Sequence, residues 1–327
     1  MKHISILVPQ NSVLQAIADP QYCFNVVNEF MVSAGNDPVF KVELVGAKHQ
    51  IKLNNGSFAV FTDRLINDVD ETDLIIIPAL FGDMNAAVDA NKDLTEWILK
   101  MHKNGAEVAS LCVGAFLLAE TGLLNHKKCS THWGFYNQFK NMYPLVDVQD
   151  GCIVTEEHKI YTSGGANSYW NLLLHLVEKY TNRATAVLIS KYFAIDISRN
   201  SQSVFTIFNG QKNHDDNEIN KAQAYIEQHF EAKFTVDDLA GKLALGRRSF
   251  ERRFKQATNN TVMEYIQRVK IEAAKRILEN SQKNITDVMY EVGYTDVKSF
   301  RSTFKKITGL SPLDYKNKYC NVGVGVG

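Results

Sequence analysis

The sequence predicts an α/β domain with a largely parallel sheet and helices on both faces, followed by an all-α domain with two helix-turn-helix motifs. Three observations support this prediction. Strand-like and helix-like apolar patterns alternate along residues 1–197, which is typical of a parallel sheet. Residues 198–217 are rich in Ser, Asn, Gln and Asp, which indicates a linker. Residues 218–320 show helical apolar spacing throughout, and one pattern occurs there twice.

Short apolar runs mark the expected strands of the first domain. The run Leu74–Ile77 contains no polar residue, as in a strand that is buried on both faces. The expected strands are His3–Val8, Phe40–Val45, Asp73–Pro78, Glu107–Leu111, Cys152–Thr155 and Lys159–Thr162. The expected helices are Tyr22–Ser33, Asp93–His102, Gly114–Thr121, Ser168–Tyr180 and Thr185–Phe193. This alternation predicts a sheet of the flavodoxin-like type.

The composition is that of a globular protein. Of the 327 residues, 45% are hydrophobic and 22% are charged, and the length predicts two domains. No apolar run approaches the ~20 residues that a membrane helix needs. The first residues also lack the basic and then apolar layout of a secretory signal. We therefore expect a cytoplasmic protein that does not associate with a membrane.

The cysteines lack the spacing of metal ligands. An odd number of them, in a chain without an export signal, indicates free thiols rather than a disulfide framework. We expect no metal and no cofactor. The five are Cys23, Cys112, Cys129, Cys152 and Cys320.

The formal net charge of zero hides an asymmetry. Residues 218–318 hold 19 Lys and Arg against 13 Asp and Glu, whereas residues 1–217 hold 17 against 23. A basic module attached to an acidic domain suits the binding of a polyanion. Without a motif, the same excess is also compatible with chance variation of the surface.

The second domain repeats itself at an offset of fifty residues. Such a repeat indicates one supersecondary unit that is used twice. The matching pairs are Ser249 and Ser299, Phe250 and Phe300, Phe254 and Phe304, Lys255 and Lys305, Thr258 and Thr308, and Tyr265 and Tyr315.

The first copy has the parts of a helix-turn-helix. Thr235 is placed as a helix N-cap, with Asp238 three residues later as a variant of the capping box. Gly246 marks the turn, and Arg247–Ala257 forms the second helix. Phe250 and its partner one turn later, Phe254, share the inward face of this helix.

The second copy has the same parts. Val288, Met289 and Val292 belong to its first helix, Gly293 allows the turn, and we expect Thr295 to cap the next helix. Phe300, Phe304 and Ile307 then face inward. Between the copies, Val262–Glu279 is long enough to be a rigid helical connector.

The outer faces of the two second helices are basic and polar. Such helices can enter the major groove, where Arg bonds guanine and Lys or Ser holds phosphates. Two of them on one connector could contact successive major-groove faces about 34 Å apart. The candidate DNA-binding residues are Arg247, Arg248, Ser249, Arg252, Arg253, Lys255, Thr295, Asp296, Lys298, Ser299, Arg301, Ser302 and Lys305.

Residues Phe234–Lys318 resemble the DNA-binding domain of the AraC/XylS family. The resemblance is carried by the runs 247–254, 292–304 and 308–315, in addition to Leu239 and Ala240. It implies binding to double-stranded DNA. Ala244 departs from the family pattern, which often has Gly in the first turn, and we expect Gly246 to compensate.

Cys112 is a candidate site residue of the first domain. It follows the strand Glu107–Leu111, and Gly114 opens the helix after it. A thiol at a strand-to-helix turn is the cysteine form of a nucleophile elbow, and the helix N-terminus favours its thiolate. This turn also lies at the sheet edge where open α/β folds bind ligands. The alternative is that Cys112 is a small buried apolar residue.

Residues 3–195 resemble the DJ-1/PfpI branch of the class I glutamine amidotransferase-like fold. Within this branch they are most similar to the GlxA-like regulators, in which the domain is fused to an AraC-type domain. The carriers are the runs Ser110–Ala119, Thr121–Leu124, Thr131–Trp133 and Ser163–Ala166.

Several residues depart from the enzymes of that branch. Val113 stands where enzymatic relatives often have His, and Gln15 lies near the place of a Glu that bonds the thiol. His132 remains as a candidate base, but it fits a structural role equally well. The run Asn167–Asn171 lacks the Asp that is common in GlxA-like proteins.

We therefore expect a pocket without catalysis, in which Cys112 and His132 are at most candidate catalytic residues. Its expected function is to bind a small-molecule effector. The candidate lining residues are Gln15, Phe81, Gly82, Cys112, Val113 and His132.

The predicted protein is a sequence-specific, DNA-binding transcription regulator that is controlled by a small-molecule effector in the α/β domain. We expect a homodimer whose contacts come from that domain. The alternative is a cysteine-dependent amidase, hydrolase or lyase of the DJ-1/PfpI type. A third possibility is that Cys112 senses oxidants.

Overall fold

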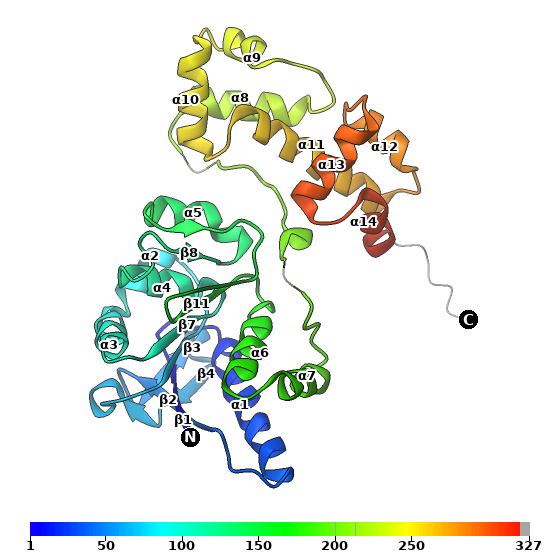
Figure 1. Ribbon diagram of the computed structural model, residues 1–327. Coiled ribbons are helices and arrows are strands. Elements are labelled where there is room, and N and C mark those ends of the chain that lie inside the picture. Colours follow the sequence, from blue (N-terminus) through cyan, green and yellow to red (C-terminus); the bar gives the residue numbers. More distant parts are fainter. Residues whose placement is uncertain (200, 213, 321–327) are drawn as a thin grey trace. The chain divides into compact units, whose positions relative to one another are not determined.

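The computed structural model describes residues 1–199, 201–212 and 214–320. The chain divides into two compact units (Figure 1). We call Met1–Gln202 the α/β unit and the part from Ser203 onward the helical unit. The division falls inside the segment 198–217 that the sequence indicated as a linker.

A seven-stranded sheet forms the centre of the α/β unit. Its strand order is β10-β11-β7-β6-β1-β2-β5, and the neighbouring strands are parallel except for β10 and β11. The prediction of a mainly parallel sheet is therefore confirmed. The strands are β1 (Lys2–Leu7), β2 (Phe40–Gly46), β5 (Arg64–Leu65), β6 (Leu74–Ile77), β7 (Glu107–Ser110), β10 (Val154–Glu157) and β11 (Ile160–Ser163).

The antiparallel pair β10–β11 has a local cause. His158 and Lys159 connect these strands, and both have positive φ, 50° and 66°. Two such residues make the tight turn that matches the twist of a hairpin, so the chain reverses directly instead of crossing over.

Helices cover both faces of the sheet. On one face α1 contacts α6 and α7, and on the other α4 contacts α2 and α3. The continuous apolar strand β6 is fully buried between these layers, as expected. The helices are α1 (Gln15–Ser33), α2 (Met84–Asp89), α3 (Lys92–Lys103), α4 (Ala115–Glu120), α5 (Tyr136–Met142), α6 (Tyr169–Tyr180) and α7 (Arg183–Tyr192).

Smaller elements complete the α/β unit. β3 (Gln50–Leu53) and β4 (Phe58–Phe61) form an antiparallel hairpin, and β8 (Lys128–Cys129) pairs in parallel with β9 (Asp147–Val148). Short 3-10 helices include Cys112–Gly114, directly after β7, and Trp133–Phe135.

The helical unit contains two hydrophobic clusters joined by one long helix. One cluster surrounds Phe250 and Phe254, and the other surrounds Phe300 and Phe304. α11 contributes Val269 to the first cluster and Ile271 and other residues to the second, so it is the connector that the repeat predicted. The helices are α8 (Asn217–Gln228), α9 (Val236–Lys242), α10 (Arg247–Thr258), α11 (Val262–Asn280), α12 (Ile285–Glu291), α13 (Val297–Thr308) and α14 (Pro312–Tyr319).

Residues 204–211, which we call the strap, lie along α11. Val204 packs against the second cluster, and Phe208 packs against the first. The Lys275 ammonium donates to the carbonyl of Thr206 at 2.6 Å, and the Phe208 N–H donates to the Glu272 carboxylate at 3.2 Å. This part of the expected linker is therefore packed structure.

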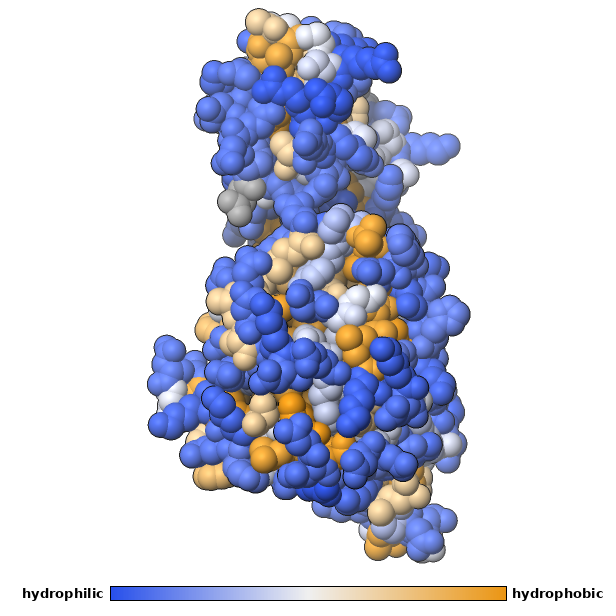
Figure 2. Space-filling view, turned by 90° about the vertical axis from the view of Figure 1, so that its left-hand side faces the viewer, coloured by the Kyte–Doolittle hydropathy of each residue, from blue (hydrophilic) through white to orange (hydrophobic). Residues whose placement is uncertain are grey.

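On the face that Figure 2 shows, the surface of both units is largely hydrophilic. On the face in Figure 2, apolar residues gather in groups, and more of these groups lie on the α/β unit. No helix among the described residues has the length and apolar character needed to cross a membrane.

Candidate nucleic-acid interface and cysteine elbow

α10 and α13 each bury one face and expose the other. Phe250 and Phe254 of α10 are fully buried, and so are their counterparts in α13. The predicted basic and polar residues on the opposite faces are solvent-exposed and therefore accessible to the major groove of DNA. These exposed residues are Arg248, Ser249, Arg252 and Lys255 on α10 and Lys298, Ser299, Arg301, Ser302 and Lys305 on α13.

Arg253 differs from the other candidate arginines. Its Nε and Nη2 donate to the two oxygens of Asp216 at 2.9 and 2.6 Å. Asp216 is also the N-cap of α8, so this bidentate pair joins α8 to α10. This pair engages the Arg253 side chain in the packing of these helices.

Arg247 lies at the start of α10 between two carboxylates. Its Nη1 is 2.8 Å from Asp237, and its Nε is 3.4 Å from Glu251. All three side chains are exposed, so these ion pairs are weak and a phosphate could replace them.

The N-cap of α13 is Asp296 and not Thr295. The Asp296 carboxylate accepts a hydrogen bond from the Ser299 N–H at 2.7 Å. The prediction that Thr295 caps this helix was therefore wrong by one residue. A carboxylate is the better cap because it also interacts with the positive end of the helix dipole.

The two turns differ at the residue that needs a left-handed backbone. In the second turn this residue is Gly293, with φ of 76°. In the first turn Ala244 itself has φ of 53°, whereas Gly246 has φ of −68° and caps α10. The expectation that Gly246 compensates for Ala244 was wrong, because the turn takes its strain at the alanine.

Cys112 occupies a strained elbow after β7. Its φ is 54°, a conformation that a non-glycine residue adopts only when its surroundings enforce it. A Cβ on Gly114 would lie 2.6 Å from the Pro78 carbonyl oxygen, so only glycine lets the elbow pack on the end of β6. The backbone of Cys112 is held by Ser163 Oγ, which accepts from its N–H at 3.3 Å, and by Thr131 Oγ1, which donates to its carbonyl at 3.1 Å.

The thiol of Cys112 is buried, with only 5% of the residue exposed. Burial raises the pKa of the thiol to about 12, although the N–H of Val113 acts in the opposite direction. The backbone donor at the start of the helix thus acts in the expected direction, but desolvation outweighs it.

His132 acts as a local cap. Its Nδ1 accepts from the Gly134 N–H at 3.1 Å, and its ring stacks on Trp133 at 5.1 Å between centroids. Burial lowers the pKa of His132. In the part of the chain that the structure describes, no hydrogen bond joins His132 to Cys112. This geometry favours the structural alternative for His132.

The other candidate pocket residues lie at one edge of the sheet. β7, β6 and β1 are neighbours, and the segments after them carry Cys112, Phe81 and Gln15. The Phe81 N–H donates to the carbonyl of Asn11 at 2.6 Å, which ties the loops after β6 and β1 together. Gln15 and Phe81 are exposed, Gly82 has φ of 91°, and Val113 is buried.

Sequence reasoning missed Gln202. This residue is fully buried, and its Nε2 lies 2.9 Å from the Thr131 carbonyl, 2.7 Å from the Tyr136 hydroxyl and 3.0 Å from the Cys152 carbonyl. A Cβ on Gly164 would lie 2.0 Å from Gln202 Nε2, so a glycine is needed there. The adjacent glycines 164 and 165 were the available signal.

Gln202 and Cys112 are connected through Thr131. The carbonyl of Thr131 accepts from Gln202, and its hydroxyl donates to the carbonyl of Cys112. The last residue of the α/β unit is thus two hydrogen bonds away from the elbow.

Asp19 was the first carboxylate after the Gln15 position. Its Oδ2 accepts from the Tyr169 hydroxyl at 2.6 Å and from Trp170 Nε1 at 3.1 Å. Burial, together with the bond to Asp19, raises the pKa of Tyr169. This carboxylate is therefore held by α6.

Two family profiles match the chain. The DJ-1/PfpI family matches residues 26–179, and a family described as a helix-turn-helix domain matches residues 239–318.

Similar curated proteins are named as transcriptional regulators. The HTH-type transcriptional regulator CdhR of Pseudomonas aeruginosa is 24% identical over 265 residues, which cover 80% of this chain and 76% of CdhR. GbdR of the same species is 22% identical over 213 residues, which cover 65% of this chain and 58% of GbdR. The activator RhaS of Citrobacter koseri is 30% identical over 101 residues, which cover 31% of this chain and 36% of RhaS.

Solved structures share the fold of part of the chain. A putative transcriptional regulator from Vibrio parahaemolyticus has a TM-score of 0.52 at 22% identity and covers 58% of this chain and 98% of its own. An AraC family transcriptional regulator from Pseudomonas putida has a TM-score of 0.51 at 13% identity and covers 59% of this chain and all of its own.

Proposed function

We propose that this chain, which joins a DJ-1/PfpI domain to an AraC-type helix-turn-helix domain, is a transcription regulator that binds double-stranded DNA through α10 and α13. The observation that carries the proposal is the pair of exposed basic faces on two helices with matching buried Phe pairs. The similarity to CdhR supports it, since it covers most of the chain.

The spacing of the basic residues assigns their roles. On α10, Arg248, Arg252 and Lys255 are four and three residues apart and therefore share one face. On α13, Arg301 has Lys298 and Lys305 three and four residues away. We assign the arginines to base edges and the lysines to phosphates, with Ser249, Ser299 and Ser302 as further phosphate donors.

The DNA-binding proposal is tested by titration of the full chain with duplexes selected from a random library. Arg248→Ala should weaken binding by roughly 1–3 kcal/mol at fixed salt if the side chain contacts a base. Lys305→Ala should instead reduce the slope of log affinity against log salt by about one. Arg183→Ala, which removes an exposed arginine of the α/β unit, is the control and should change neither quantity. Unchanged binding for both test variants would refute the proposal that the basic faces of α10 and α13 contact DNA.

The effector site belongs to the same proposal. We place a small-molecule effector at the carboxyl edge of β1, β6 and β7, where open α/β sheets bind ligands. The strained elbow supports this site, and so does the route from Cys112 through Thr131 to Gln202, where the chain leaves the α/β unit.

The effector site is tested with two equally exposed phenylalanines. Phe81 is 68% exposed on the loop after β6, and Phe61 is 67% exposed on the β3–β4 hairpin. In a reporter strain supplied with candidate metabolites, Phe81→Ala should reduce the response, whereas Phe61→Ala should not. Equal effects of the two variants would contradict the position of the site.

We propose that the α/β unit is not catalytic. Burial raises the pKa of the Cys112 thiol, so little of it is the nucleophilic thiolate at neutral pH. The one observation that favours the alternative, a cysteine-dependent amidase, hydrolase or lyase, is the elbow with φ of 54°. Turnover of an amide or an α-dicarbonyl compound that disappears in Cys112→Ala would establish that alternative.

We further propose a homodimer formed by the α/β unit. Tyr22 of α1 and Leu188 and Tyr192 of α7 are exposed, and the two tyrosine hydroxyls lie 3.0 Å apart. Such an aromatic patch is typical of an interface. Leu188→Glu should lower the sedimenting mass to that of a monomer, whereas Leu145→Glu, at another exposed leucine, should not.

A cytoplasmic location is part of the proposal. The relatives come from bacteria, in which the DNA that a regulator binds lies in the cytoplasm.

A further inference from the structure

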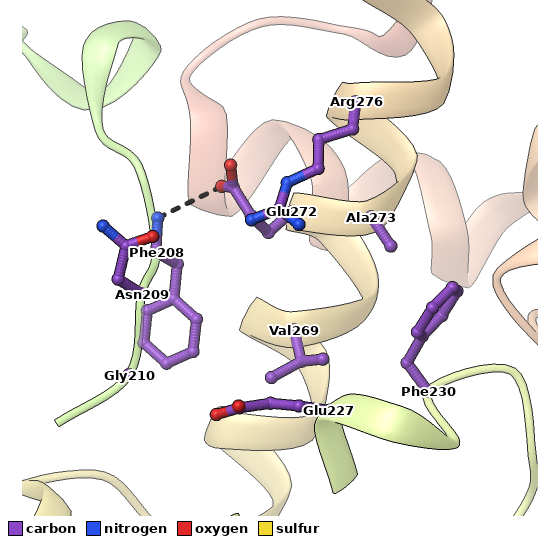
Figure 3. Close-up of a pocket in the computed structure, with 9 residues that line it drawn as sticks. All are labelled: Phe208, Asn209, Gly210, Glu227, Phe230, Val269, Glu272, Ala273 and Arg276. Atoms are coloured by element: carbon purple, nitrogen blue, oxygen red, sulfur yellow. Dashed lines mark hydrogen bonds between the residues drawn. The ribbon is translucent and has the colours of Figure 1, made fainter. Parts of the chain in front are cut away.

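A cavity of about 260 Å³ lies inside the helical unit, between the strap and α11 (Figure 3). Strap residues Phe208, Asn209 and Gly210 form one side of it. The opposite side comes from α11, and Glu227 and Phe230 at the end of α8 complete the lining.

Part of the cavity wall is apolar. The ring of Phe208 lies opposite the side chain of Val269, and Ala273 and Phe230 extend the same surface (Figure 3). For comparison, an apolar cavity of roughly 150 Å³ holds benzene. This cavity therefore has room for a body of that size and one polar group.

The two carboxylates in the lining already have cationic partners. Glu227 is 2.7 Å from the ammonium of Lys212. Glu272 is 2.8 Å from the ammonium of Lys275 and also accepts from the Phe208 N–H. Their negative charges are therefore largely neutralised before any ligand arrives.

Arg276 is different. Its guanidinium lines the cavity, is exposed at the rim, and forms no hydrogen bond or ion pair within the described part of the chain. Because lysines already neutralise the two carboxylates of the lining, the charge of Arg276 remains uncompensated. The cavity therefore presents one positive charge next to an apolar surface.

We propose that this cavity binds a small organic monocarboxylate with an aromatic or branched apolar body. The carboxylate pairs with Arg276, whose planar guanidinium can hold both oxygens. The body packs against Phe208, Val269 and Ala273. This site is separate from the effector site of the α/β unit, and its existence does not depend on the proposed regulatory function.

The test measures binding of 4-fluorobenzoate to the purified full chain by ¹⁹F nuclear magnetic resonance, with 4-fluorobenzamide as the uncharged analogue. The carboxylate should bind at least ~10-fold more tightly than the amide, because only the carboxylate gains the Arg276 ion pair. Arg276→Gln should bring the affinity for the carboxylate down to that for the amide. Arg183→Gln, at an exposed arginine of the other unit, should leave it unchanged.

A second variant tests the apolar wall. Ala273→Leu places additional carbon atoms in the cavity and should weaken both probes while the far-ultraviolet circular dichroism stays that of the wild type. The proposal is overturned if 4-fluorobenzoate fails to bind at about 10 mM, if the amide binds equally well, or if Arg276→Gln retains full affinity. Because the readout is binding without DNA, loss of the regulatory proposal would not affect it.

Discussion

Exchanging glycine and alanine between the two helix-turn-helix turns should shift the stability of the helical unit in opposite directions. Gly293 and Ala244 each follow directly on the C-cap of the first helix of a motif, and both have left-handed backbones, with φ of 76° and 53°. Gly293→Ala adds a Cβ that would lie 2.0 Å from the backbone oxygen of Glu231 and 2.6 Å from Lys270 Nζ. Ala244→Gly removes a Cβ from the strained position.

The magnitudes follow from three contributions. A left-handed backbone costs a residue with a Cβ about 1–2 kcal/mol. Forcing the Glu231 carbonyl away from a new methyl group adds about 1–3 kcal/mol. Restricting the unfolded chain by replacing glycine returns about 0.5–1 kcal/mol. Gly293→Ala should therefore destabilise the helical unit by about 2–4 kcal/mol, and Ala244→Gly should stabilise it by up to about 1 kcal/mol.

Urea unfolding of the full chain can separate the two units. All three tryptophans, Trp97, Trp133 and Trp170, belong to the α/β unit, so their fluorescence reports on that unit alone. Circular dichroism at 222 nm also follows the helical unit. Both variants should leave the fluorescence transition in place and move the remaining circular dichroism transition in opposite directions. A shift of both variants in the same direction would refute the strain argument.

The remaining predictions concern the α/β unit and one ion pair. Cys112 should react slowly with iodoacetamide at pH 7.5 and about tenfold faster per pH unit above it, because its pKa is raised by burial; mass spectrometry that finds rapid labelling at neutral pH would contradict this. Gln202→Ala should destabilise the α/β unit by about 1–3 kcal/mol in the fluorescence transition, since the buried Thr131 carbonyl loses its donor, whereas the Cys152 carbonyl still accepts from Ser130 Oγ and the Tyr136 hydroxyl from the Gly151 N–H. The hydrogen bond from Arg253 lowers the pKa of Asp216, so this pair stabilises the fold above the unfolded-state pKa near 3.9, and the stabilisation is lost as pH falls through the lower folded-state value. Asp216→Asn should accordingly weaken the loss of stability at acid pH, measured by circular dichroism at 222 nm. An unchanged pH dependence would show that the Arg253–Asp216 pair does not cause this loss.

The alternation of strands and helices was predictable because buried strands of a parallel sheet have a continuous apolar sequence. The start of α1 was not, since Pro20 lies inside this helix and Leu14 before it supplies no side-chain cap. β8 and β9, with two residues each, are too short for any period to appear in their sequence.

The two candidate sites differ in how far the sequence could predict them. The exposed faces of α10 and α13 follow from helical geometry alone, and the fifty-residue repeat fixed their positions. The Arg253–Asp216 pair joins residues 37 positions apart through packing, so no local pattern indicates it. The burial that raises the pKa of Cys112 is likewise a property of the packed unit and not of the strand-to-helix turn.

The strap determines where the helical unit can be joined to a different sensor domain. A regulator assembled by joining a foreign sensor domain to residue 217 would lose Phe208 from the first cluster and would leave Glu272 and Lys275 of α11 without their strap partners. A junction just before Ser203 keeps the strap with the helices that it covers. The portable segment for domain exchange, in the laboratory or in evolution, thus begins well upstream of the first helix of the DNA-binding domain.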